Sequence, residues 1–303
     1  MWTRRFVLGA SALALLASPA YAADWRSKYP EVVFSVVPSE NAGGVLNRYE
    51  PFIKHLSDVL GVKVSLRIAN DYAAVIEAMR SGQVHVAHFG PSSYARAYQV
   101  TKGDVEPFAT AKSAAGVVGY YSVLYVRADD KAKSVQDLKG RNLCLVDPNS
   151  TSGNNVPRFA LDKMGIEPDQ FFGKVVYAGS HENAVTALLQ GTCDGAFNWW
   201  NSETDSMLRR MATRGMVKPE QVRIVLKSDM IPGSPTTLKR SLPDDMKADI
   251  KRAFLEAPVK GREAWLRISD GANTDYAEVK HEDYQVIIDL NRFVDQLRRK
   301  SGS

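Results

Sequence analysis

The chain has 303 residues, of which 45% are hydrophobic, and a formal net charge of +5. This length and apolar content suffice for two domains with packed cores, which excludes a disordered chain. Basic and acidic residues are interspersed without a basic tract, so we expect no nucleic-acid partner.

The first 22 residues have the pattern of a signal peptide. Arg4 and Arg5 precede an apolar run at residues 6–17, and small residues up to Ala22 form a cleavage pattern. A bilayer-spanning helix needs about 20 apolar residues, so a retained anchor fits less well. We expect cleavage after Ala22, which lowers the net charge to +3 by removing the two arginines, and delivery to the periplasm. The arginine pair also resembles a twin-arginine signal, so the export route stays open.

The first part of the mature chain alternates between β-branched runs and amphipathic stretches, which predicts βαβ units. Gly61 follows one predicted helix and fits the left-handed conformation that ends a helix. Asn70 or Asp71 can cap a later helix that runs through Met79 and is closed by Gly82. The predicted strands are 32–37, 64–68 and 84–89, and the other helices are 46–60 and 91–98.

The same alternation restarts at residue 121 and predicts a second lobe. Its expected strands are 121–126, 142–146, 175–177, 195–199 and 224–226, and its helical segments are 135–138, 153–164, 183–189 and 203–214. Helices at 243–254 and 284–298 are expected to pack on the first lobe. We therefore predict an α/β fold of two hinged lobes, residues 23–122 plus 229–303 and residues 123–228. Each lobe is expected to be a mainly parallel sheet flanked by helices, with a ligand in the cleft.

Cys144 and Cys193 are the only cysteines, and each lies in or beside an apolar run. We expect them to be small buried hydrophobic residues, although a single oxidised pair within one lobe stays open because an exported protein meets an oxidising compartment. Two cysteines cannot complete a tetrahedral zinc site, and no histidines stand at ligand spacing beside them. We expect no metal.

Three junctions between a strand and a helix suit an anion, because helix N-termini present unpaired N–H groups and a positive dipole end. The strongest is Asp-Pro-Asn-Ser-Thr-Ser-Gly at residues 147–153, where Ser150, Thr151 and Ser152 supply three adjacent hydroxyls. Helix caps alone would explain one such hydroxyl, but three exceed what a cap needs. The other junctions place Tyr72 and His181 in first helical turns.

Over residues 33–235 the chain resembles the phosphate, phosphite and phosphonate substrate-binding proteins of ABC importers. The resemblance is carried by Asp-Tyr-Ala at 71–73, Gly-Tyr-Tyr-Ser-Val at 119–123, the string at 147–153, Ala-Gly-Ser-His-Glu at 178–182 and Ile-Pro-Gly at 231–233. It implies a type II-like periplasmic binding protein that works as a monomer without a cofactor and delivers its ligand to a membrane permease. It also implies that the phosphorus oxygens are held by Tyr72, Tyr120, Ser150, Thr151, Ser152 and His181.

The sequence departs from this family at the organic end of the ligand. Ser234 stands where an aminophosphonate-binding member has an aspartate that contacts the amine. A second family acid corresponds to either Asn201 or Glu203, and Glu203 could still face an ammonium group. His88 is either an added donor or a packed histidine at the rim.

Two other functions compete with capture of a phosphonate. One is a secreted phospho- or ester hydrolase with Ser150 or Ser152 as the nucleophile and His181 as the base, although the chain lacks Gly-x-Ser-x-Gly. The other is a ligand-sensing subunit of a membrane kinase, which a soluble sequence does not distinguish from a transport protein. We predict a binding protein rather than an enzyme.

Overall fold

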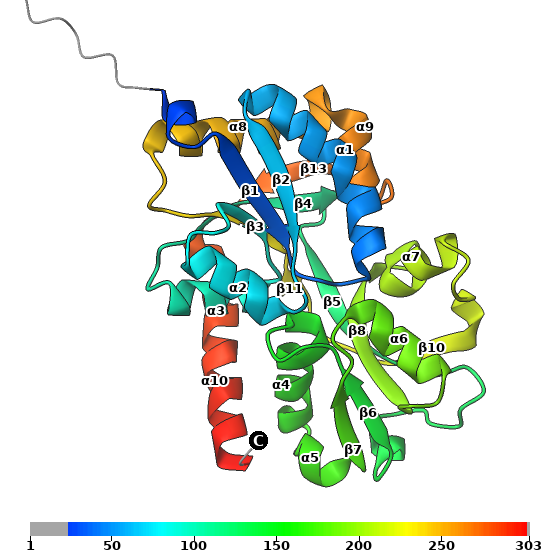
Figure 1. Ribbon diagram of the computed structural model, residues 1–303. Coiled ribbons are helices and arrows are strands. Elements are labelled where there is room, and N and C mark those ends of the chain that lie inside the picture. The colour runs from blue at the N-terminus through cyan, green and yellow to red at the C-terminus, as the bar shows by residue number, and fades with distance from the viewer. Residues whose placement is uncertain (1–23, 302–303) are drawn as a thin grey trace, which may run out of the picture.

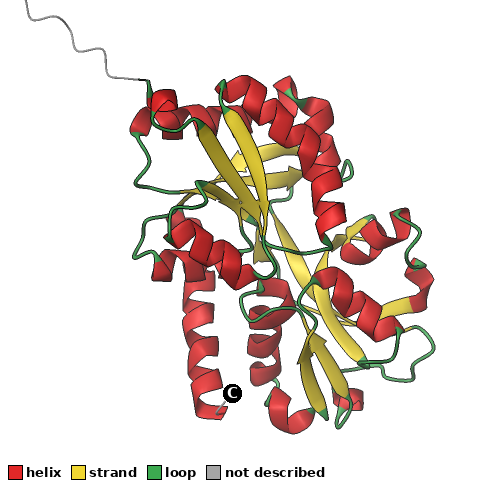
Figure 2. Ribbon diagram, viewed as in Figure 1, coloured by secondary structure: helices red, strands yellow, loops and turns green. Residues whose placement is uncertain are grey.

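The computed structural model describes residues 24–301, so the predicted signal peptide lies outside the described residues. Two sheets lie one above the other, each with its own helices, as Figures 1 and 2 show. We call the elements around the upper sheet the first lobe and those around the lower sheet the second lobe. The predicted two-lobed α/β arrangement is confirmed. No helix within residues 24–301 is long and apolar enough to cross a membrane.

The sheet of the first lobe has the strand order β13-β4-β12-β3-β1-β2. These strands are β1 (Glu31–Val36), β2 (Lys63–Ile68), β3 (Val86–His88), β4 (Glu106–Ser113), β12 (Pro235–Leu238) and β13 (Asn273–Glu278). Its helices are α1 (Ala42–Leu60), α2 (Tyr72–Arg80), α3 (Pro91–Val100), α8 (Asp244–Lys260) and α9 (Arg262–Ile268), with short 3₁₀ turns at Trp25–Ser27 and His281–Tyr284.

The sheet of the second lobe has the order β10-β5-β8-β6-β7, with β11 paired to β5 and β9 to β8. These strands are β5 (Gly119–Arg127), β6 (Asn142–Leu145), β7 (Lys174–Tyr177), β8 (Gly195–Ser202), β9 (Asp205–Ser206), β10 (Val222–Lys227) and β11 (Ile231–Pro232). Its helices are α4 (Val156–Lys163), α5 (Pro168–Phe171), α6 (His181–Leu189) and α7 (Met207–Thr213), with 3₁₀ turns at Gln136–Leu138 and Pro219–Gln221.

The sheets are mixed, so the prediction of mainly parallel sheets was wrong. Only β1–β2 and β1–β3 are parallel in the first lobe, and only β6–β7 and β6–β8 in the second. The remaining pairs are antiparallel, because β12 and β13 return from distant parts of the chain and β5 enters the second sheet between β8 and β10. The parallel strands still end at the cleft, which is what positions a ligand site.

The core of the first lobe is aromatic. Phe254 of α8 makes edge contacts with Phe34 of β1 and Phe52 of α1, with ring centroids 5.6 and 5.4 Å apart. The helix ends follow the predicted signals, since Gly61 closes α1 at φ +67° and the Asp71 carboxylate accepts from the N–H of Ala74 to cap α2. Burial of these side chains fixes β1 and α1, and therefore the strand ends at the cleft.

Helix α10 (Gln285–Ser301) bridges the lobes, whereas we expected it to pack on the first lobe alone. It runs beside α3 and continues along α4 (Figure 1). Asn291 accepts from Asn155 Nδ2 of the second lobe at 3.0 Å and donates to the carbonyl of Ser92 at 2.9 Å. The Phe293 and Phe159 rings meet edge to face at 5.6 Å. The apolar spacing correctly predicted a helix but did not identify both of its neighbours.

Candidate functional site

A cavity of about 660 Å³ lies between the lobes and is lined by strand ends and helix starts from both. It gathers the six predicted anion-binding residues, which we call the cradle: Tyr72, Tyr120, Ser150, Thr151, Ser152 and His181. Of the four residues predicted to face the substituent, His88, Asn201 and Ser234 also line this cavity. Glu203 does not, because it lines a separate cavity of about 270 Å³ beside Trp200 and Arg209.

The three hydroxyl residues form a tight turn after β6. Ser150 caps a π-helical turn, Thr151–Asn155, by accepting from the N–H of Gly153 at 3.1 Å. Only glycine fits at position 153, because a Cβ there would lie 2.4 Å from the side chain of Val146. Ser150, Thr151 and Ser152 are each only 2% exposed. The turn therefore presents main-chain N–H groups and hydroxyls to a desolvated space.

Thr151 is linked to the opposite lobe. Its Oγ1 accepts a hydrogen bond of 2.8 Å from the N–H of Ser92, in the first turn of α3. Because that N–H occupies an acceptor position, the hydroxyl proton of Thr151 remains free to donate elsewhere. Thr151 therefore connects the lobes and can still act as a donor toward the cavity.

Two tyrosines complete the cradle on the side of the first lobe and the crossing, Tyr72 buried and Tyr120 partly buried. Tyr72 is the first residue of α2, and Tyr120 lies at the start of β5. Burial raises the pKa of Tyr72 far above its ordinary value and raises that of Tyr120 to about 12. Both phenols therefore stay protonated at neutral pH, so each can donate a hydrogen bond to an anion.

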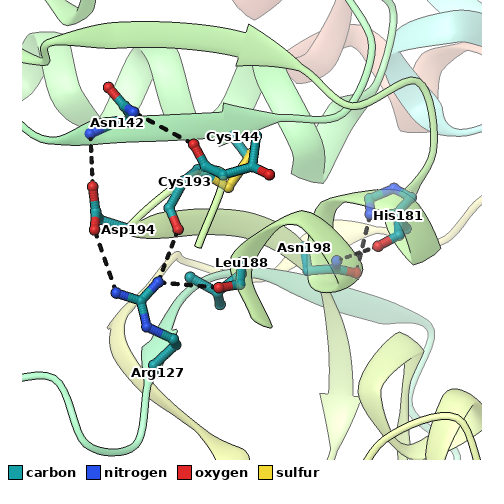
Figure 3. Close-up of a disulfide and its surroundings, with 9 residues drawn as sticks. Arg127, Asn142, Cys144, His181, Leu188, Cys193, Asp194 and Asn198 are labelled. Atoms are coloured by element: carbon teal, nitrogen blue, oxygen red, sulfur yellow. Dashed lines mark hydrogen bonds and ion pairs between the residues drawn. A yellow bond between two sulfur atoms is a disulfide. The ribbon is translucent and has the colours of Figure 1, made fainter. Parts of the chain in front are cut away.

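His181 is held by Asn198 of β8 (Figure 3). His181 Nδ1 lies 3.1 Å from Asn198 Oδ1, while Asn198 Nδ2 donates to the carbonyl of His181 at 2.9 Å. On the other side of the ring, Nε2 lies 3.4 Å from Ser150 Oγ. Burial lowers the pKa of His181 to about 3, so the imidazole is neutral. An imidazole with so low a pKa is a weak general base, so the arrangement of Ser150 and His181 does not favour the hydrolase function.

The residues predicted to face the substituent lie beside a carboxylate. Burial, reinforced by Arg48, lowers the pKa of His88 to about 4, so this ring is neutral as well. Asn201 donates to the carboxylate of Asp205, which also lines the cavity and which sequence reasoning missed. Burial raises the pKa of Asp205. No signal in the sequence indicated it, because Asp205 comes next to Asn201 only through the β8–β9 hairpin, in which it pairs with Ser202.

A cluster of ion pairs joins the lobes next to the cavity, and we call it the inter-lobe cluster. The first lobe contributes Glu40, Arg48 and Asp270, and the second lobe contributes Glu182, Arg210 and Arg214. Arg214 lies 3.1 Å from Glu40 and 2.8 Å from Glu182. Arg210 lies 3.2 Å from Asp270. Sequence reasoning missed the cluster, because its members are far apart in the chain.

Cys144 and Cys193 are buried, as expected, and they form a disulfide, so the open alternative of one oxidised pair within one lobe is confirmed (Figure 3). Their Cα atoms are 5.8 Å apart because Cys144 of β6 pairs with Ala196 of β8, close to Cys193 in the chain. The bond closes a loop that contains Ser150, Thr151, Ser152 and His181. It therefore braces the part of the cradle that the second lobe contributes. Within residues 24–301, no three His, Cys, Asp or Glu side chains gather as a metal site would require.

Known proteins are similar to this chain in sequence. The phosphate-import protein PhnD of Mycolicibacterium smegmatis is 33% identical over 267 residues, covering 83% of this chain and 81% of the relative. The phosphonates-binding periplasmic protein of Escherichia coli is 31% identical over 247 residues, covering 80% and 70%.

Two solved structures have a fold similar to that of this chain. The binding protein component of an ABC phosphonate transporter from Pseudomonas aeruginosa matches with a TM-score of 0.79 and 26% identity, covering 88% of this chain and 87% of that one. PhnD1 from Prochlorococcus marinus, solved with methylphosphonate, has the same fold with a TM-score of 0.76 and 18% identity, covering 88% and 98%.

The family model for the periplasmic phosphonate substrate-binding proteins of ABC transporters matches residues 34–284. Its members bind and deliver a substrate and are not enzymes. The chain belongs to this family of periplasmic substrate-binding proteins.

Proposed function

We propose that the protein captures a phosphonate in the cleft between its lobes and delivers it to the membrane permease of an ABC importer. The observation that carries this proposal is the cradle itself. Six side chains with neutral polar groups line one cavity, five of them at helix starts and Tyr120 at the start of β5. This set of donors suits the oxygens of a tetrahedral anion.

The energetics support tight capture without a cation in the cradle. A hydrogen bond to a charged group contributes about 1.5–3 kcal/mol, and several such bonds can replace the water shell of the anion. Arg48 and Arg210 also line the cavity, but both are paired with acidic residues of the inter-lobe cluster. The cradle can therefore bind its anion through hydroxyls and helix N-termini alone.

The size of the cavity supports a phosphonate, which carries an organic group, over an inorganic ion such as phosphate. Relatives are named for phosphate import and for phosphonate binding, and one solved neighbour holds methylphosphonate. A cavity of about 660 Å³ far exceeds a single tetrahedral ion and leaves space for an organic group. We assign the wall formed by His88, Asn201, Asp205 and Ser234 to that group.

We further propose that residues 23–122 plus 229–303 and residues 123–228 close as rigid lobes about the two crossings. A ligand that reaches both lobes binds the closed state more tightly, which shifts the population that the permease recognises. The protein acts as a monomer with no nucleic-acid partner. It reaches the periplasm through a signal peptide that is cleaved after Ala22.

Calorimetry of the mature protein against methylphosphonate, 2-aminoethylphosphonate, phosphite, phosphate and sulfate tests the proposal. We expect saturable one-to-one binding, with a phosphonate bound most tightly and no product released. If no phosphorus oxyanion binds, the proposed function is wrong. Tighter binding of phosphate than of any phosphonate would instead reassign the ligand within the same cradle.

A further inference from the structure

The orientation of the Asn198 amide sets the position of the proton on His181. Asn198 Nδ2 donates to the carbonyl of His181 at 2.9 Å, and Asn198 Oδ1 accepts from the N–H of Trp199 at 3.0 Å. Two main-chain partners therefore fix which end of the amide is the oxygen. That oxygen lies 3.1 Å from His181 Nδ1 (Figure 3). Two acceptors at this distance would repel, so Nδ1 must carry the proton.

The consequence lies at the other ring nitrogen. A neutral imidazole with its proton on Nδ1 has a lone pair on Nε2, and His181 lines the cavity beside Ser150. The contact from Nε2 to Ser150 Oγ is 3.4 Å, which is longer than a normal hydrogen bond involving a hydroxyl. Nε2 therefore keeps the capacity to accept a stronger bond. His181 therefore faces the anion as an acceptor and not as a donor.

The other members of the cradle can donate. Tyr72 and Tyr120 are protonated phenols, and Thr151 keeps its hydroxyl proton because its oxygen accepts from Ser92. A ligand oxygen that faces these groups needs no proton of its own. A ligand oxygen that faces His181 Nε2 must bring one, because two lone pairs would otherwise meet in a desolvated space.

We propose that His181 Nε2 is a specificity determinant that accepts a hydrogen bond from a protonated ligand oxygen. The cradle then selects the hydrogen form of a phosphonate or phosphate and rejects tetrahedral anions without a proton, such as sulfates and sulfonates. This inference rests on the proposed function, since it concerns how the same cleft recognises its ligand. The charged groups around the ring do not supply an alternative proton, because Arg210 is paired with Asp270 and Glu182 is paired with Arg214.

Methylphosphonate and methanesulfonate form a matched pair of probes. Below the second ionisation of methylphosphonate the two ions share shape and a single negative charge, and they differ by one proton on oxygen. Calorimetry of the wild-type protein at such a pH should show methylphosphonate binding at least about tenfold more tightly, because methanesulfonate would leave one buried acceptor unpaired. Affinities within about threefold of each other would overturn the inference while leaving the proposed function standing.

His181→Gln is the test variant, because a glutamine amide reaches a similar position and can rotate to present either N–H or C=O. The preference for methylphosphonate should fall at least tenfold. Thr151→Ala is the matched control, since it removes a donor that both ions use and should weaken both by a similar factor. A preference that survives in His181→Gln would contradict the assigned role.

A ligand-free measurement keeps the inference testable if the variant does not fold. Long-range ¹H–¹⁵N NMR of the histidine rings in the wild-type protein should show His181 at neutral pH with Nδ1 protonated and Nε2 unprotonated. A proton on Nε2, or an imidazolium ring, would overturn the inference. This result does not depend on ligand binding, so failure of the proposed function and failure of the acceptor role remain distinguishable.

Discussion

The cradle and the inter-lobe cluster lie side by side and use opposite chemistry. The cradle, which we propose binds an anion, consists of neutral hydroxyls, phenols and one neutral imidazole. The cluster binds no ligand in this account and consists of three acidic and three basic side chains. Arginines are therefore used to join the lobes, while dipoles and hydroxyls are used to recognise charge.

Because of this difference, ligand selectivity should depend on the cradle and closure of the lobes on the cluster. Within the cluster, the side chains of the first lobe carry a net charge of −1 and those of the second lobe carry +1, so the lobes attract each other there. That attraction is the same whatever ligand is bound. The cradle, in contrast, depends on the hydrogen-bond pattern of the ligand. A change at His181 of the cradle should alter which ligand binds, and changes in the cluster should alter all affinities together.

The largest expected effect comes from the cradle. Replacing Thr151 and His181 together by alanine removes two hydrogen bonds to a charged ligand, which should weaken methylphosphonate binding roughly 1,000-fold. Calorimetry measures this loss, and thermal unfolding should show that the variant stays folded. Thr213→Ala, an exposed threonine of α7, is the control and should bind as the wild type does. Unchanged affinity in the double variant would reject the proposed site.

The disulfide should contribute mainly to stability. Replacing Cys144 and Cys193 by serine opens a loop with a sequence separation of 49. The chain-entropy estimate for a loop of this size is about 4 kcal/mol of unfolding free energy, which denaturant titration measures. The ratio of methylphosphonate to phosphate affinity should stay the same in the folded fraction. A changed ratio would mean that the covalent brace also shapes the cradle.

A change at Arg214 tests the cluster without altering a contact with the ligand, because Arg214 does not line the cavity. Arg214→Gln removes contacts with Glu40 and Glu182 and should weaken methylphosphonate and phosphate by the same factor, about tenfold. Arg214→Lys should restore part of the affinity. Arg209→Gln, on an exposed position of the same helix, is the matched control. A factor that differs between ligands would show that the cluster also takes part in selection.

The smallest expected effect concerns Asp205. Burial raises its pKa in the folded protein, so ionisation at neutral pH costs stability that is present at low pH and is lost as the pH rises from the unfolded value through the folded one. Asp205→Asn should therefore raise the unfolding free energy at pH 7 by less than about 1 kcal/mol. The gain should disappear in acid, where both side chains are neutral. A variant that is less stable than the wild type at pH 7 would contradict this reading.

Local signals in the sequence predicted most of the elements that surround the cradle. Asp71, Ser150 and Ser180 each precede a helix and accept from its first turn, so the helix starts were readable from single residues. Gly61 also indicated a helix end, because glycine readily adopts the left-handed conformation found there. Five of the six cradle residues follow from these starts, whereas Tyr120, at the start of β5, was indicated only by the family resemblance.

Contacts between distant segments were not readable in this way. Strands β12 and β13 pair with β4 in antiparallel fashion although more than a hundred residues separate them in the chain, and their short sequences carry no sign of that partner. The Cys144–Cys193 bond and the contact of Arg214 with Glu40 likewise depend on which strands and helices become neighbours. The orientation of the Asn198 amide depends on three-dimensional hydrogen bonds, so the acceptor role of His181 could not be deduced from spacing.

A crystal structure of the mature protein with methylphosphonate tests the central claim most directly. We predict that the phosphorus oxygens lie within hydrogen-bond distance of Ser150, Thr151, Ser152 and His181, and that no arginine contacts them. Arg48 and Arg210 line the same cavity, so a cationic site is a real alternative. An anion bound to either guanidinium, away from the turn at residues 150–152, would contradict the account.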